Sequence, residues 1–233
     1  MLIDERPMFH KGETEIERSF TVEESMLSAK QVQQLSGTAL TCYGIGKDVL
    51  SFIAKNISKG EKTLETGAGC STLVFAYCGA VHTAVTPSGS EIELIKKYAA
   101  EQEIDMGAVT FVPQSSDYFL PRNEDEGYNM VLLDGKHAFP WPVVDWFYTA
   151  DKLKKDGLML IDDAEMRSVS ILIDFMNADP NWELVQDFDG KTLAFKKTKD
   201  KTLDVAWHMQ PYSVVHQSPV KKIISKIKHL TNR

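Results

Sequence analysis

Short apolar runs alternate with longer, helix-compatible stretches through the middle of the chain, and this alternation constrains the fold more than any other feature. The strand candidates span residues 63–66, 81–85, 109–112, 130–133 and 158–161, and the helix candidates span 91–102, 143–153 and 168–176. Such a βαβ series builds a parallel sheet through right-handed crossovers, with helices on both faces. Ligands of these sheets bind beyond the carboxyl ends of the strands, where the strand order reverses.

Two further strand-like runs, 182–188 and 192–197, follow the series and are joined through Asp189-Gly190. Asp-Gly accepts the positive φ angles of a tight hairpin, so these runs should pair antiparallel. The predicted fold is α/β: a Rossmann-like, doubly wound, mostly parallel seven-stranded sheet that ends in an antiparallel hairpin. An ordinary dinucleotide-binding fold has parallel strands at that place.

Composition narrows the class of protein. The chain has 233 residues, of which 43% are hydrophobic and 25% charged, as is typical of one folded domain. The formal net charge of -7 argues against nucleic-acid partners, which usually meet a basic face. The three cysteines, Cys42, Cys70 and Cys78, lack the paired spacing of a zinc site or a disulfide framework, which favours a reducing cytoplasm. No apolar run reaches the length of a membrane span.

A glycine bend follows the first strand of the series, at Glu65-Thr66-Gly67-Ala68-Gly69, and leads through Cys70-Ser71-Thr72 into a helix. Glycines 67 and 69 allow a sharp turn and a close approach of backbone to ligand, and a helix N-terminus offers unpaired N–H groups. A single G-x-G is weak evidence, and a tight turn without a ligand explains it about equally well. The position of this bend, after a strand and before a helix, favours a nucleotide-like ligand.

The bend resembles motif I of the class I S-adenosylmethionine (SAM)-dependent methyltransferases, and two later segments are similar to motifs of a small-molecule O-methyltransferase-like branch. These segments are Leu133-Asp134-Gly135-Lys136-His137 and Ile161-Asp162-Asp163. The resemblance covers about residues 35–197 and implies that SAM is the cofactor. It implies cofactor contacts at Glu65, Gly67, Ala68, Gly69, Ser71, Thr72, Thr86, Ser116 and Asp117.

One position departs from the family pattern. In the family, an acid usually ends the second strand and binds the ribose. This chain has no acid there, and the corresponding run is Val85-Thr86-Pro87-Ser88. Thr86 or Ser88 could make that contact, or Glu91 could reach back. After the third strand, Ser116 and Asp117 fall where the family often contacts adenine. An ordinary helix N-cap, which serine and aspartate favour, explains these residues equally well.

Carboxylates follow two apolar strands, Asp134 after the fourth and Asp162-Asp163 after the fifth, with His137 nearby. Three carboxylates and an imidazole meeting at one edge would suffice to bind Mg²⁺, which prefers oxygen ligands, and the ion would lower the pKa of a bound hydroxyl. The arrangement is similar to that of catechol-type O-methyltransferases, with Asp163 in place of the usual Asn. In a metal-free alternative, Asp134 and His137 are catalytic and His137 is the general base. The remaining interpretation is a loop histidine and helix-capping aspartates.

The two ends of the chain differ from the centre. We expect an N-terminal helical cap over 1–60, a SAM-binding core over 61–198 and a C-terminal arm over 199–233. Within the arm, Val220, Ile223, Ile224 and Ile227 recur at helical spacing among basic residues. That amphipathic helix would dock on the domain or on a second subunit of a homo-oligomer, or make weak contact with an anionic membrane surface.

Three functions are consistent with these features. The first is methyl transfer from SAM to an oxygen of a small hydroxylated metabolite, such as a sugar, in the cytoplasm. The second is a methyltransferase-like binding or assembly module without turnover. The third is a nicotinamide-dependent oxidoreductase, against which the terminal hairpin argues.

Overall fold

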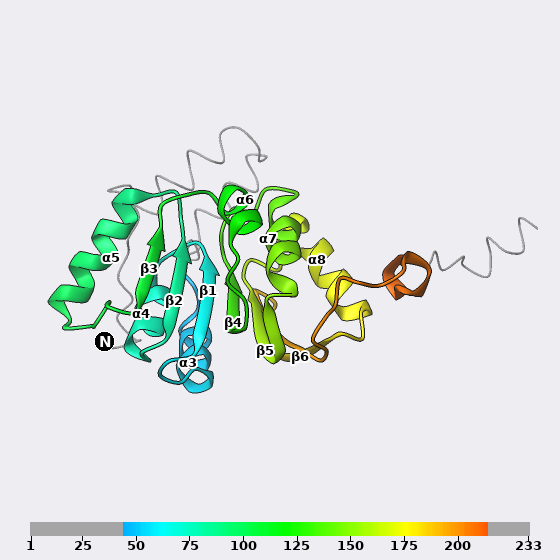
Figure 1. The fold of residues 1–233 in the computed structure, drawn as a ribbon, viewed down its shortest axis with the longest axis horizontal. Coiled ribbons are helices and arrows are strands. Elements are labelled where there is room, and N and C mark those ends of the chain that lie inside the picture. Colours follow the sequence, from blue (N-terminus) through cyan, green and yellow to red (C-terminus); the bar gives the residue numbers. More distant parts are fainter. Residues whose placement is uncertain (1–43, 214–233) are drawn as a thin grey trace, which may run out of the picture.

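A single seven-stranded sheet organises the protein (Figure 1). The structure, a computed structural model, describes residues 44–213. The strand order is β3-β2-β1-β4-β5-β7-β6, with β1 to β5 parallel and β7 antiparallel to both of its neighbours. The strands are β1 (Lys62–Thr66), β2 (Val81–Val85), β3 (Val109–Val112), β4 (Tyr128–Leu133), β5 (Leu153–Ile161), β6 (Trp182–Phe188) and β7 (Thr192–Lys197). The predicted fold class is confirmed, including the antiparallel ending.

Helices cover both faces of the sheet, as Figure 1 shows. They are α3 (Lys47–Asn56), α4 (Cys70–Tyr77), α5 (Gly89–Glu101), α6 (Ser116–Phe119), α7 (Trp141–Ala150) and α8 (Arg167–Ala178), with short 3₁₀ turns at Leu120–Arg122, Trp207–Met209 and Pro211–Ser213. One core cluster contains side chains of α3, α4 and α5, and the other contains side chains of α7 and α8. The two clusters are separated by the sheet, so the sheet is doubly wound, as predicted.

Strand β4 shows why the sheet can carry two cores. Met130 and Leu132 belong to the first cluster, whereas Val131 and Leu133 belong to the second. Successive side chains of a strand point to opposite faces, so a run that is apolar at every position is buried on both sides. The unbroken apolar run of the sequence is therefore what a central parallel strand requires.

The boundary between α7 and β5 differs from the prediction. A helix was expected over 143–153, but α7 ends at Ala150, and Leu153 already pairs with Tyr128 of β4. The side chain of Lys197 on β7 donates hydrogen bonds from its buried ammonium to the carbonyl oxygens of Ala150 (2.7 Å) and Leu153 (2.8 Å). A residue distant in the chain thus satisfies the groups that the helix end leaves free.

The hairpin between β6 and β7 forms as the sequence predicts. Asp189 and Gly190 have φ angles of 53° and 71°, which glycine and aspartate tolerate better than most residues. The register places Phe188 opposite Thr192. The hairpin brings Thr192 and its neighbour Lys191 back to the carboxyl end of β5, next to the predicted site.

Several predicted features lie wholly or partly outside the described residues. These are residues 1–43 of the predicted N-terminal cap, with Cys42 among them, and the basic amphipathic helix after residue 213. Of the predicted cap, α3 is described, and it packs into the first core cluster, with Phe52 edge-on to Phe188 at 5.4 Å. Between residues 44 and 213, no helix combines the length and the apolar character needed to cross a membrane.

Candidate active site at the carboxyl ends of the strands

The strand order reverses between β1 and β4, and the carboxyl ends of these strands lie side by side with that of β5. Thr66 pairs with Leu133, and Leu133 pairs with Ile161. The amide of Asp134 donates to the carbonyl of Thr66 (3.0 Å), and the amide of Asp162 donates to the carbonyl of Leu133 (3.0 Å). The glycine bend and both acidic segments therefore start at one edge of the sheet, as the strand pattern predicts.

The two glycines of the bend have different functions. Gly67 has a φ of +86°, and a Cβ atom there would overlap the backbone carbonyl oxygen of Asp134. Gly69 has an extended φ of -179°, and a Cβ atom there would meet no atom within 4 Å. Gly67 is thus required for packing of the bend against the β4 loop, whereas the open space beside Gly69 is where a ligand can approach the backbone.

Three predicted cofactor residues direct their side chains into the protein. Glu65 is buried, and its carboxylate accepts a hydrogen bond of 2.6 Å from the Ser71 hydroxyl and another from the Thr72 hydroxyl. Thr72 Oγ1 in turn accepts a hydrogen bond of 3.0 Å from the amide of Gly69. These side chains hold the bend together, and the half-buried segment Gly67, Ala68 and Gly69 presents backbone to the mouth of the sheet.

The predicted ribose position is built from hydroxyl side chains. Thr86 is buried at the end of β2, and its hydroxyl accepts a hydrogen bond of 3.3 Å from the Ser88 amide. Ser88 caps α5, where its side chain accepts a hydrogen bond from the amide of Glu91 at 3.4 Å. The local function of both residues in the structure is thus to shape the turn that leads into α5.

The two residues predicted to meet adenine are placed differently. Ser116 is buried, whereas Asp117 is exposed and lies 3.5 Å from the indole nitrogen of Trp141. A hydrogen bond from Ser115 is the main cause that lowers the pKa of Asp117. The ammonium of Lys136 lies 3.6 Å from the centre of the Trp141 ring. Trp141 thus connects the loop after β3 to the loop after β4.

A cluster of three side chains stands at the mouth, formed by Asp134, His137 and Asp163. His137 Nε2 lies 3.0 Å from Asp163 Oδ2 and 3.7 Å from Asp134 Oδ1. All three side chains keep between 20% and 25% of their surface exposed. Lys191, from the β6–β7 turn, lies 4.0 Å from the other oxygen of Asp163. The cluster is therefore open to a ligand and combines carboxylates with an imidazole.

Asp162 does not join this cluster, although the sequence grouped it with Asp134 and Asp163. Its carboxylate is buried and accepts a hydrogen bond from the hydroxyl of Thr192 on β7. At the end of a strand, adjacent side chains are directed to different sides, so Asp162 and Asp163 face different surroundings. Ligand atoms of Asp134, His137 and Asp163 all lie within 4.8 Å of one another. A cation there would meet two carboxylates and the imidazole, without the third carboxylate that the sequence predicted.

Burial and mutual repulsion shape the acidity of the site. Burial, followed by the charges of Asp162, Asp163 and Glu65, holds the pKa of Asp134 well above its usual range. Burial also raises the pKa of Asp162, against the hydrogen bond from Thr192. Perturbed carboxyl groups of this kind are common at functional sites.

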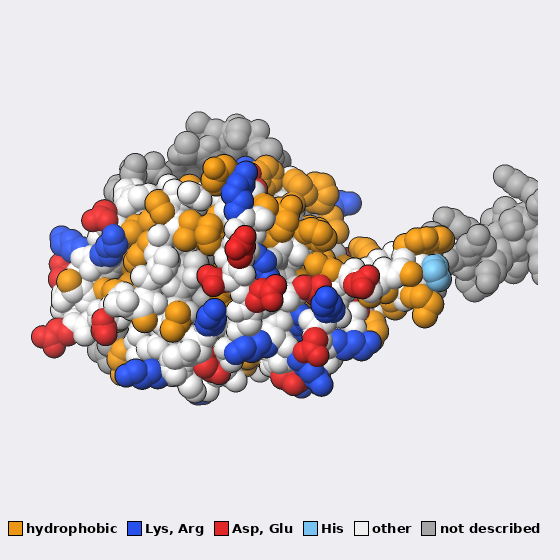
Figure 2. Space-filling model, viewed as in Figure 1, with side chains coloured by type: hydrophobic (Ala, Val, Ile, Leu, Met, Phe, Trp, Pro, Cys, Tyr) orange, Lys and Arg blue, Asp and Glu red, His pale blue; other side chains and the backbone are white. Residues whose placement is uncertain are grey.

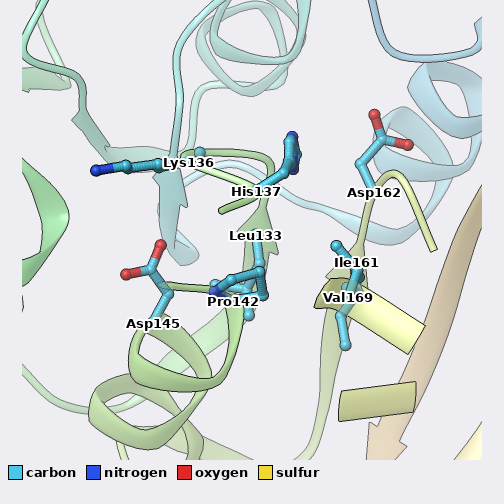
Figure 3. A pocket seen from close by; sticks show the side chains of 9 residues that line it. Leu133, Lys136, His137, Pro142, Asp145, Ile161, Asp162 and Val169 are labelled. Atoms are coloured by element: carbon cyan, nitrogen blue, oxygen red, sulfur yellow. The ribbon is translucent and has the colours of Figure 1, made fainter. Parts of the chain in front are cut away.

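A shallow recess opens beside His137 (Figure 3). Figure 3 shows Asp145 and Asp162 on opposite sides of it, with the loop that carries His137 between them. Asp145 belongs to α7, is buried, and has one carboxylate oxygen without a hydrogen-bond partner. The recess is lined by Leu133, Gly135, Lys136, His137, Pro142, Asp145, Ile161, Asp162 and Val169.

Sequence reasoning missed three charged or titratable residues: Asp145 and Lys191 near the mouth, and His82, which is buried beside Glu65. His82 interrupts the apolar run of β2, and Asp145 stands among the apolar residues of α7, so each carried a signal as a polar residue at a buried position. Lys191 carried none, because only the hairpin brings it to the site. Of the aromatic residues that follow the Asp134 segment, Trp146 is in the core, whereas Phe139 is 64% exposed. Figure 2 shows hydrophobic side chains gathered around α6 and α7 on this face.

Comparison with protein-family models gives no match, and neither does comparison with curated protein sequences. Solved structures do match. A protein of Staphylococcus aureus assigned to the caffeoyl-CoA O-methyltransferases has a TM-score of 0.55 and 14% identity, covering 78% of this chain and 98% of its own. The chain has the class I methyltransferase fold. The resemblance drawn from the sequence motifs is thus confirmed at the level of the fold.

Two other proteins show how widely this methyltransferase fold is used. A Streptococcus mutans protein assigned as a methyltransferase was solved with SAH; it has a TM-score of 0.51 and 10% identity, covering 65% of this chain and 96% of its own. An rRNA methylase of Streptococcus thermophilus has a TM-score of 0.51 and 12% identity, covering 66% of this chain and 96% of its own.

The rRNA methylase corrects one prediction. The net charge was taken to exclude nucleic acid and to leave a small molecule as the acceptor, but a protein with the same fold acts on RNA. The exclusion was wrong because net charge describes the whole chain, whereas docking depends on the local surface around the mouth.

Proposed function

We propose that the protein is a SAM-dependent methyltransferase that transfers the methyl group to a hydroxyl oxygen of its acceptor. The observation that carries the proposal is the cluster of Asp134, His137 and Asp163 at the same sheet edge as the open glycine bend. The fold adds support, since one protein that shares it was solved with SAH. The class of acceptor molecule is left to the experiment below.

The bend is suited to the polar end of SAM. Gly69 directly precedes α4, and a Cβ atom at Gly69 would meet no protein atom within 4 Å. The positive end of the helix dipole attracts a carboxylate at such a terminus. SAM carries a carboxylate on its methionine part, and the side-chain contacts of Glu65 with Ser71 and Thr72 fix the backbone that would receive it.

The cluster is suited to activating a hydroxyl. Asp163 contacts one ring nitrogen of His137, which fixes the orientation of the ring. In the proposed step the acceptor oxygen attacks the methyl carbon, the sulfur–methyl bond breaks, SAH leaves, and the hydroxyl proton passes to the imidazole. Imidazole is the side chain best suited to take up a proton near neutral pH. Positioning of oxygen, methyl carbon and sulfur in line contributes most of the rate.

A divalent cation also fits the cluster by the separation of its ligand atoms. Asp134, Asp163 and His137 would hold it, and it would polarise the acceptor oxygen as a Lewis acid. The imidazole makes this set less typical of Mg²⁺, which prefers oxygen ligands throughout. We therefore place the proton-accepting function on His137 and treat cation dependence as an outcome of the test.

The test begins with calorimetry of the full chain against SAM, SAH and NAD. We expect binding of SAM and SAH and none of NAD. Transfer of labelled methyl groups is then followed to a panel of hydroxylated small molecules and to RNA, with and without EDTA or added Mg²⁺. Activity that survives EDTA and is lost in His137→Asn, with SAH affinity unchanged, supports the base function. SAM binding without transfer to any acceptor would support the binding-module alternative.

A further inference from the structure

His82 lies in the middle of β2 and has no contact with solvent, with 1% of its surface exposed. Its ring stacks on that of Phe75 from α4, with centroids 4.4 Å apart and planes 17° from parallel. Nδ1 lies 2.8 Å from the hydroxyl of Thr63, the residue opposite on β1. A polar ring held between strand and helix loses its water shell, so its nitrogens require partners inside the protein.

The second nitrogen of His82 faces the acid of the glycine bend. Nε2 lies 3.1 Å from Oε1 of Glu65, close enough for an ion pair although not aligned as a regular hydrogen bond. Glu65 is two residues beyond Thr63 on β1, so the side chains of both residues point to the same face of the sheet. His82 therefore bridges a hydroxyl and a carboxylate that would otherwise stand apart on that strand.

The contacts continue from Glu65 to the bend itself. The carboxylate receives the hydroxyls of Ser71 and Thr72, and Thr72 Oγ1 receives the amide of Gly69. A carboxylate only accepts hydrogen bonds, so its polar neighbours must act as donors. An N–H on Nε2 of His82 would face the same carboxylate at 3.1 Å as a third donor outside regular hydrogen-bond geometry, and Nδ1 would then accept the hydroxyl hydrogen of Thr63. Inside the protein, the low dielectric strengthens such polar contacts.

We propose that His82 is a positioning residue for SAM binding. It fixes Glu65, which fixes Ser71 and Thr72, and these set the backbone of Gly69 before the cofactor arrives. This inference rests on the proposed function, because it takes SAM to be the ligand of the bend. A binding loop that is already ordered binds more tightly, because less conformational freedom is lost on association.

The experiment measures SAH affinity of the full chain by calorimetry, together with hydrogen exchange of the segment 66–73. In His82→Leu, which removes both nitrogens, we expect affinity to fall at least about tenfold and exchange to speed up. In His82→Gln, whose amide can still donate to Glu65, we expect affinity within about threefold of wild type. Met176→Ala is the control for stability, because Met176 is buried on α8 in the other core cluster.

Thr63→Val keeps the shape of the side chain and removes one hydroxyl from the network. It is therefore the second test variant, used if His82→Leu does not fold. We expect about a threefold loss of SAH affinity in this variant. Wild-type affinity and exchange in the folded variants would overturn the inference while leaving the proposed function intact, and so would an equal loss in Met176→Ala. Failure of the wild-type chain to bind SAH would overturn both.

Discussion

Gly67 packs its Cα against the backbone carbonyl oxygen of Asp134, so closely that any Cβ atom there would overlap it. The contact joins the bend after β1 to the loop after β4, and the Asp134 amide reinforces it by donating to the Thr66 carbonyl at 3.0 Å. The candidate cofactor loop and the acidic cluster are therefore one rigid unit, and the two glycines of the bend can be distinguished by experiment.

Gly67→Ala should destabilise the fold. The new methyl group would overlap the Asp134 carbonyl, and a φ of +86° is unfavourable for alanine. We expect a loss of about 2–4 kcal/mol in the free energy of unfolding, measured by urea denaturation. A variant as stable as wild type would show that the bend can relax away from the β4 loop.

Gly69→Ala should instead separate binding from stability. The methyl group meets no protein atom within 4 Å, and the extended backbone is open to any residue. We expect unfolding free energy within about 1 kcal/mol of wild type, the usual range for a change at a helix cap. SAH affinity, measured by calorimetry, should fall at least about tenfold if the cofactor lies against this position. Unchanged affinity would place the ligand elsewhere.

Lys197→Met should be costly, although methionine fits an apolar site. The ammonium of Lys197 is fully buried and donates to the carbonyls of Ala150 and Leu153, while burial lowers its pKa. Without it, two buried carbonyls lose a charged donor, and we expect a loss of about 2–4 kcal/mol in urea denaturation. Lys196→Met is the matched control, because Lys196 pairs at the surface with Glu183 and should change stability by less than about 1 kcal/mol.

Asp145→Asn should stabilise the protein at neutral pH. Burial raises the pKa of Asp145 to about 6. The folded state therefore keeps a proton that the unfolded state releases above its ordinary pKa of 3.8, so stability falls as pH rises through this window. The variant should lack that fall and gain about 1–3 kcal/mol at pH 7.

Denaturation at several pH values checks the behaviour of Asp145. Asp174→Asn, which removes one exposed charge from α8, is the control and should keep the wild-type pH profile. A parallel loss of stability with pH in wild type and Asp145→Asn would show that another group is responsible. A reduced SAH affinity in Asp145→Asn would extend the function of this acid to the cofactor side of the mouth.

Much of the fold could be predicted because strand and turn signals are local. The runs 81–85 and 109–112 and both strands of the hairpin coincide with β2, β3, β6 and β7. The end of α7 could not be predicted, since it depends on Lys197, a residue of the last strand. Local periodicity identifies an element, whereas its ends are set by partners that come from elsewhere in the chain.

The sequence by itself determined that acids and a glycine bend meet at one edge of a parallel sheet, because strands of known direction bring their carboxyl ends together. Only the tertiary structure decided which side chains face one another there. Asp163 turns to His137, Asp162 turns to Thr192, and Glu65 turns inward to Ser71 and Thr72. The reason is that a side chain's direction follows from the partners that satisfy its charge after burial, and these partners lie far from it in sequence.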